Sequence, residues 1–216
     1  MTNQFDGERH VALPLDPMKV EPVVLDGRFI RLEPLSLARH AELCEVGLDE
    51  EIWRVSPTNI STPEKLRAYI EAALKEQAEG TALPFATIEK ESGRAIGSTR
   101  FANIDRANRR AEIGWTWVAR QWQRTPVNTE AKYLMLCHAF ETLGCLRVEF
   151  KTDLLNQKSR AALSRIGAKE EGVFRNHMLC DSGRIRHSVY FSIIDSEWPG
   201  VKAGLEEKLS RPYLPV

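Results

Sequence analysis

Apolar residues recur every third or fourth position in several segments, the spacing that gathers them on one face of an α-helix. Ser36 is a candidate cap for the first segment, and Ser61–Thr62–Pro63–Glu64 gives a second segment the capping-box spacing with proline in its first turn. Gly144 stands where a left-handed cap can end another helix. The predicted helices span residues 36–48, 62–80, 131–143 and 156–166, with a last one capped by residue 195 or 196 and ending before Pro212.

Strict alternation of apolar and polar residues, which is typical of β-strands, marks other segments. Two short runs flank Asp26–Gly27, and glycines at 93 and 183 separate further pairs as turns. The remaining strands are expected at residues 83–89, 95–103, 110–118, 146–151, 173–179 and 188–194.

Helices and strands alternate along the chain without a break large enough to separate two cores. The pattern therefore predicts one α/β domain of the α+β kind. Residues 1–22 carry three prolines and little periodicity, and are expected to form a flexible or surface-laid arm. Residues 23–200 would make up the domain, and residues 201–216 a C-terminal helix and tail that belong to it.

Composition narrows the kind of protein further. Thirty basic and thirty acidic side chains give the 216 residues a net charge of zero, which argues against broad binding of DNA. No apolar run approaches the length of a membrane span, and the first ten residues lack the apolar stretch of a signal peptide. Four cysteines without CxxC spacing fit reduced core residues better than a metal site. We expect a cytoplasmic protein that uses no metal.

A short loop joins a predicted strand to the long apolar helix, an arrangement that can bind phosphate at the helix N-terminus. Thr125 can cap that helix with Pro126 in its first turn, or Asn128 and Thr129 can cap a slightly later start. Arg124 adds a positive charge beside the same position. Because most such loops bind nothing, the loop alone is weak support for a phosphate site.

Several stretches, taken in order, resemble the GNAT superfamily of acyl-CoA N-acyltransferases, and within it the RimJ/RimL-like branch. The resemblance covers about residues 23–200, and the ordered set is more specific than any one stretch. The matching stretches are Ala111–Trp115, Val127–Lys132, Leu146–Thr152, Asn156–Leu163, Gly167–Ala168, Glu171–Gly172 and Glu197–Trp198.

The resemblance implies a mixed sheet of six or seven strands that splays after its fourth strand, with the pantetheine arm of CoA in the gap. It also implies acetyl-CoA or another acyl-CoA as co-substrate. The residues that would contact it are Trp117, Val118, Gln121, Arg124, Thr125, Val127, Asn128, Thr129, Asn156 and Arg160. For Arg160, as for Lys132, the alternative is a helix-surface charge without a specific role. For Asn156 the alternative is a helix N-cap.

The loop departs from the family at two positions. The family form is Gln/Arg-x-x-Gly-x-Gly/Ala, whereas this chain has Arg124 and Pro126 in place of the small residues. Arginine resists positive φ and proline has no N–H, so at least one phosphate donor is lost, at a cost on the order of 1.5–3 kcal/mol. Either the Arg124 guanidinium meets phosphate directly and compensates, or cofactor binding is weakened.

Transfer of an acyl group to an amine needs a proton acceptor for the ammonium and a proton donor for the leaving thiolate. Glu112 on the central strand is the first candidate base, with a surface ion pair as the equal alternative. His177 is the second, although a structural histidine is the more common case. The tyrosine that many GNAT enzymes use as acid is replaced by Leu163, and Ser159 is the candidate in the RimL-like pattern. An oxyanion would be met by a backbone N–H near Val118.

These residues predict an acyl-CoA-dependent N-acyltransferase whose acceptor is a protein N-terminus or a small amine. The alternative is a GNAT-fold protein that binds CoA weakly and acts as a binding or regulatory module. The altered loop favours the alternative, whereas Glu112, Asn156 and Ser159 together favour the enzyme. A membrane partner is not expected. Branch members often form dimers, so a homodimer is an expectation.

Overall fold

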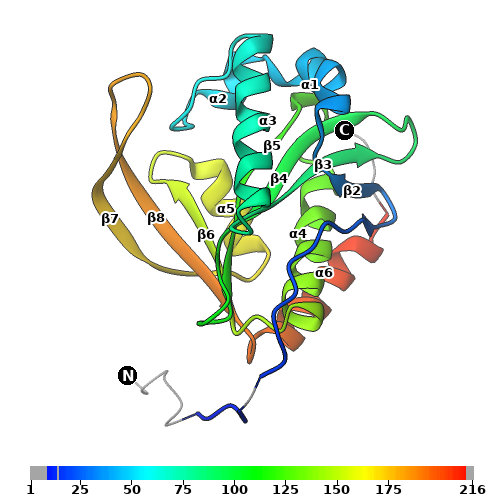
Figure 1. Cartoon of the computed structure of the whole chain (residues 1–216), viewed down its shortest axis with the longest axis vertical. Helices are drawn as coiled ribbons and strands as arrows, with labels where there is room; N and C mark the ends of the chain where they lie inside the picture. Colours follow the sequence, from blue (N-terminus) through cyan, green and yellow to red (C-terminus); the bar gives the residue numbers. More distant parts are fainter. Residues whose placement is uncertain (1–8, 14, 213–216) are drawn as a thin grey trace.

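Eight strands form one mixed sheet in the computed structural model, which describes residues 9–13 and 15–212 (Figure 1). The sheet order is β1-β2-β3-β4-β5-β6-β8-β7, and every neighbouring pair is antiparallel except β5 and β6. The strands are β1 (Leu25–Asp26), β2 (Ile30–Pro34), β3 (Leu83–Glu89), β4 (Ala95–Asp105), β5 (Arg110–Val118), β6 (Arg147–Asp153), β7 (Lys169–Leu179) and β8 (Ile185–Ile194).

Helices cover both faces of this sheet. They are α1 (His40–Gly47), α2 (Glu50–Trp53), α3 (Pro63–Ala78), α4 (Val127–Cys137), α5 (Gln157–Arg165) and α6 (Trp198–Ser210). Short turns at Leu37–Arg39 and Arg120–Trp122 precede α1 and α4, and the π-helical turn His138–Thr142 extends α4. Among the residues the structure describes, no helix combines the length and apolar content needed to cross a bilayer.

The sheet divides the core into two parts, one on each of its faces. Phe85 of β3 belongs to the larger cluster, which includes residues of α4, α5 and α6. Its neighbour Ala86 belongs to the smaller cluster, beneath α1, α2 and α3. Successive side chains of a strand point to opposite faces, so the same strands serve both clusters.

The α/β fold class and the main elements agree with the sequence analysis, with five differences. The sheet has eight strands because the two residues of β1 pair with β2. Helix α2 was not expected. Ser36 precedes its helix but makes no side-chain cap bond, and Glu197, not residue 195 or 196, takes the N-cap position of α6. The N-cap of α3 is Thr62, whose side chain accepts from the Lys65 N–H, one residue later than the capping-box spacing predicts.

The described part of the N-terminal arm lies against the domain. Met18 is buried in the larger cluster, and Arg9 pairs with Asp195 beyond the last strand. Arg109 donates to the Asp16 carbonyl at 2.7 Å and to two carbonyls at the end of the helical turn after α4. Residues 1–8, Pro14 and 213–216 lie outside the described residues.

Strands β5 and β6 separate soon after they meet. Their parallel pairing runs only from Arg110↔Arg147 to Glu112↔Glu149, although both strands continue. Trp115 has a φ of 48°, and the pairing of β5 with β4 shifts register there, which marks a bulge. The remaining part of β5 therefore faces a gap in the sheet. This gap follows the fifth strand, not the fourth, because β1 adds one to the count.

Candidate active site

The N-terminus of α4 lies beyond the end of β5. Pro126 takes the N-cap position instead of Thr125, and the Thr125 hydroxyl oxygen accepts from the Val127 N–H at 3.3 Å. Helix geometry leaves the N–H groups of Asn128 and Thr129 without intrahelical acceptors. The side-chain oxygen of Asn128 is buried and has no hydrogen-bond partner within the described ranges. An anion at this helix end would find free backbone donors and a favourable dipole.

The loop before α4 keeps the backbone conformation that a glycine would give it. Arg124 has a φ of 65°, in the left-handed region, and its side chain is exposed. Arginine is strained in this conformation, at a cost of order 1–2 kcal/mol, as the sequence analysis expected. The surrounding loop nonetheless imposes the conformation. Thr125 donates to the Trp122 carbonyl at 2.6 Å, and the Gln123 side chain donates to the Val118 carbonyl at 3.0 Å. Gln121 lies exposed in the same loop.

Two residues at the end of β5 have side chains turned into the protein. Trp117 packs on Trp53 with ring centroids 5.6 Å apart, and its indole N–H has no partner among the described residues. Val118 belongs to the larger core cluster. A ligand in the gap would therefore meet these two residues through their backbone.

Helix α5 begins on the far side of the gap, directly after β6. Asn156 caps it, because its side-chain oxygen accepts from the Ser159 N–H at 3.0 Å. Its amide NH₂ group is still available as a donor. Arg160 donates to Glu170 at 3.1 Å, and Leu163 is buried in the larger core cluster. The helix cap expected as the alternative role of Asn156 is thus present, and Arg160, whose alternative was a surface charge without a specific role, forms an ion pair.

Glu112 lies on the opposite face of β5 from α4. Its side chain is buried, accepts from Asn103 at 2.9 Å, and lies 3.4 Å from the Lys151 ammonium. Gly114 leaves room for the carboxylate, since an added Cβ would come within 3.0 Å of its oxygen. Glu112 therefore forms an ion pair, as one alternative of the sequence analysis expected, but the pair is buried and its partner is a lysine.

A cavity of about 490 Å³ opens beside this carboxylate. It is lined by Asn103, Arg110, Glu112, Arg147, Glu149, Glu171, Gly172, Phe174 and Tyr190. The Lys151 ammonium lies 5.7 Å from the centre of the Trp115 ring and 5.9 Å from that of Tyr190. Trp115 is 40% exposed, so an aromatic side chain borders this surface, on which acidic and basic side chains are paired.

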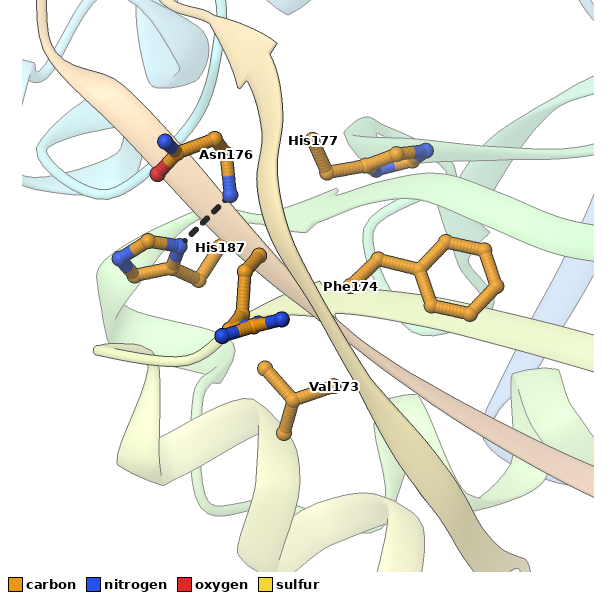
Figure 2. A pocket seen from close by; sticks show the side chains of 6 residues that line it. Val173, Phe174, Asn176, His177 and His187 are labelled. Atoms are coloured by element: carbon orange, nitrogen blue, oxygen red, sulfur yellow. Dashed lines mark hydrogen bonds between the residues drawn. The ribbon is translucent and has the colours of Figure 1, made fainter.

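His177 enters this region from β7. Figure 2 shows His177 and Phe174 on one side of the strand and Asn176 and His187 on the other, beside an open groove. The His177 ring lies 5.8 Å from that of Tyr190. Strand β7 therefore places His177 on the same side of the hairpin as an aromatic residue that lines the Glu112 cavity.

A hydrogen bond to Ser188 links His177 to the neighbouring strand. Arg186 can only donate, and its Nε donates to the buried Ser188 hydroxyl oxygen at 3.1 Å. The same hydroxyl lies 2.9 Å from His177 Nδ1, and it donates to that nitrogen when the ring proton is on Nε2. Burial and the nearby charges of Lys151 and Arg186 lower the pKa of His177, which favours the neutral ring. A neutral ring that accepts at Nδ1 carries its proton on Nε2 and acts there as a donor.

Lys132 is the site residue that the sequence analysis underrated. It is 5% exposed, whereas a helix-surface charge was expected. The one indication in the sequence is its position inside a helix that is apolar on nearly every side. The partial exposure of Trp115 beside Glu112 depends on the bulge in β5, which no periodicity reveals.

Comparisons with known proteins identify the family. Residues 30–169 match the acetyltransferase (GNAT) domain family. A GCN5-related N-acetyltransferase from Brucella melitensis has a similar structure, with a TM-score of 0.82 and 34% identity over 89% of this chain and 87% of that one. The chain therefore belongs to the GNAT acetyltransferase family.

More specific similarity supports the RimJ/RimL-like branch. The "Putative ribosomal N-acetyltransferase YdaF" of Bacillus subtilis is 36% identical over 110 residues. That match covers 51% of this chain and 59% of the relative, so the chain spans less than two thirds of that curated protein. RimJ of Mycobacterium smegmatis, solved in complex with CoA-disulfide, shares the fold, with a TM-score of 0.72 and 24% identity over 83% of this chain and 88% of that one.

Proposed function

We propose that this protein transfers an acetyl or other short acyl group from CoA to a primary amine of a protein N-terminus or a small molecule. One observation supports this most strongly. The pairing of strand β5 with β6 ends directly after Glu112. This leaves a gap with helix N-termini on one side and a buried carboxylate on the other. A thioester held from the first side can meet an amine arriving from the second.

On the CoA side, the N–H groups of Asn128 and Thr129 are the donors for the diphosphate. Arg124 lies exposed beside them and can add its guanidinium. Gln121, Thr125 and Val127 complete the loop and the first turn of α4. Trp117 and Val118 would contribute backbone groups to the pantetheine arm and to the oxyanion. Asn156 offers its NH₂ group across the gap, and Arg160 lies in the first turn of the same helix.

On the amine side, Glu112 takes the proton that the ammonium must lose before it attacks the thioester. His177 serves as a hydrogen-bond donor through Nε2, not as the base, because Ser188 occupies Nδ1. Ser159 lies in the first turn of α5, and its hydroxyl is the candidate donor to the leaving thiolate. The ammonium proton goes to Glu112, and the amine nitrogen then bonds to the thioester carbon. As the C–S bond breaks, its electron pair goes to sulfur, and the second proton of nitrogen reaches the thiolate through the Ser159 hydroxyl, which gives one proton and takes one.

A second function is favoured by one feature of the loop. Pro126 has no N–H, so the diphosphate site has one donor fewer than the family pattern provides. A protein with this loop that no longer turns over CoA thioesters would act as a binding or regulatory module. Its fold would be the same, and only CoA affinity and turnover would differ.

The first experiment separates the two functions. CoA binding is measured by calorimetry, and a panel of acyl-CoAs is incubated with peptides bearing free N-termini and with small amines, with release of free thiol as the readout. The enzyme proposal predicts CoA binding and amine-dependent thiol release for at least one pair. Absence of turnover together with absence of CoA binding would support the regulatory module.

Replacement of Arg124 by glycine should change stability and CoA binding in opposite directions. Glycine adopts the φ of 65° without strain, so the free energy of unfolding should rise by about 0.5–1 kcal/mol. Loss of an exposed guanidinium contact to phosphate should weaken CoA binding about fivefold, which corresponds to about 1 kcal/mol. Denaturant unfolding and calorimetry measure the two effects.

Asparagine at position 124 is the matched control, because it tolerates the left-handed region and carries no charge. It should weaken CoA binding as much as glycine does. Tighter binding by either variant would show that Arg124 obstructs the site and does not compensate for the lost amide.

A further inference from the structure

Lys132 is an almost fully buried lysine with one hydrogen-bond partner. It lies in the second turn of α4, 5% exposed, and its ammonium donates to the Thr116 hydroxyl oxygen at 2.8 Å. Thr116 lies in turn 2.7 Å from the hydroxyl of Thr99 on β4. The lysine nitrogen is thus bonded to one neutral hydroxyl group, which is itself bonded to a second.

The charged groups on the surrounding elements are engaged elsewhere. Glu130, on the same helix, accepts from the backbone N–H groups of residues 28–30. Arg100 of β4 pairs with Glu76, and Glu112 of β5 is bound to Asn103 and Lys151 on the other face of the sheet. Within residues 9–13 and 15–212, no carboxylate lies at ion-pair distance from Lys132. Burial alone lowers its pKa to about 7.

Thr116 connects this buried amine to the gap in the sheet. It follows the bulge at Trp115 and lies beyond Glu112↔Glu149, the last pair that joins β5 to β6. Thr116 itself is exposed, although its hydroxyl contacts a buried lysine. The lysine therefore lies one hydroxyl group behind the surface that a pantetheine arm would contact.

Buried cations in proteins are normally paired, because an unpaired charge in a low dielectric is costly. A lysine without a carboxylate reduces this cost by losing its proton, and it regains the proton when a negative charge arrives. CoA brings several negative charges, and the start of α4, where the diphosphate would bind, is less than two turns from Lys132.

We propose that Lys132 is charged by its ligand: above pH 7 it is mostly neutral in the empty protein, it takes up a proton when CoA fills the gap, and it then offsets the negative charge of CoA through Thr116. This inference rests on the proposed function, since it needs CoA to bind. Its consequence for transfer is a positive charge close to the thioester while negative charge develops there.

Calorimetry of CoA binding in two buffers of different ionisation enthalpy, Tris and HEPES at pH 8, measures the proton uptake directly. With a pKa of about 7, about nine tenths of the Lys132 amines are neutral at this pH, so the wild type should take up close to one proton per CoA. Lys132→Met, of similar length, should take up almost none. Lys75→Met, which changes an exposed lysine of α3, should behave as the wild type.

The pH dependence of the Kd for CoA should reflect the same proton uptake. Between pH 7.5 and 8.5 the Kd of the wild type should rise up to tenfold more than that of Lys132→Met, because only the wild type must regain a proton. Equal proton uptake and equal pH dependence in the two proteins would overturn the assignment while leaving the acyltransferase proposal intact. Absence of CoA binding in the wild type would contradict the acyltransferase proposal itself.

A measurement on the unaltered protein covers the case in which the methionine variant does not fold. The ¹³Cε resonance of labelled Lys132 should titrate near pH 7 in the empty protein and above pH 9 with CoA. A resonance that titrates near the ordinary lysine value of about 10.4 in the empty protein would overturn the proposal.

Stability gives an independent check of the neutral amine. The unfolded chain binds a proton at Lys132 up to about pH 10.4, whereas the folded protein releases it near pH 7, so the stability cost of this lysine is full at and below pH 7 and disappears as the pH rises to about 10.4. Lys132→Met should therefore stabilise the protein more at pH 7 than at pH 10. An equal effect at both pH values would contradict a lowered pKa.

Discussion

Replacement of Glu130 by alanine should lower the free energy of unfolding by about 3–5 kcal/mol. The buried carboxylate accepts from the N–H groups of Arg28, Phe29 and Ile30 at 2.7–2.8 Å. Each buried donor left without a partner costs about 1–3 kcal/mol, and water can reach the outermost of the three. Gly27 lets the carboxylate come this close, because an added Cβ would lie 2.6 Å from it. Urea unfolding followed by circular dichroism measures the loss.

Glu207 provides the control, since it is an exposed glutamate of α6 paired only with Arg211. Glu207→Ala should change stability by less than about 0.5 kcal/mol. Glu130→Gln keeps one acceptor oxygen and should fall between the wild type and alanine. If Glu130→Ala were as stable as the control, the three hydrogen bonds would not hold the β1–β2 turn on α4.

Replacement of Glu112 by glutamine should reduce kcat/KM for acyl transfer by about a hundredfold, the usual contribution of one general base. Glutamine keeps the size of the side chain and an oxygen for Asn103, so the fold and CoA binding should be preserved. Thiol release measured against pH is the readout. The acidic limb of the kcat/KM profile should be weakened in the variant, because the group that must be deprotonated is gone.

Glu71→Gln, an exposed glutamate of α3, is the matched control and should retain full activity. A Glu112→Gln enzyme with an unchanged rate and pH profile would remove Glu112 from the mechanism. The ion pair with Lys151 would then be its whole role, and a water path would have to carry the proton of the amine.

Much of the fold could be predicted because local patterns and tertiary contacts agree. The alternation in residues 146–151 became β6, and glycines 144 and 167 end helical segments with φ values of 63° and 93°. Helix α2 was missed because four residues are too few for a periodic pattern. The N-cap of α4 was misplaced by one residue, since both Thr125 and Pro126 suit a helix start.

The candidate site was only partly accessible from the sequence. Glu112 and the start of α4 could be named as candidates because they lie in stretches that resemble the family in sequence and in order along the chain. The roles of Asn156 and Arg160 stayed open until their partners, the Ser159 amide and Glu170, could be seen. The donor role of His177 depends on Ser188 and Arg186, which come from the neighbouring strand β8.

The sequence by itself determined the family, the order of the elements and the residues available for chemistry, because these follow from local spacing and motif order. Only the tertiary structure decided the states of those residues. The loop around Arg124 imposes a left-handed backbone, and packing of α4 against β5 encloses Lys132 away from the carboxylates of the described residues. Burial and partner geometry depend on residues distant along the chain, and they determine which groups carry charge.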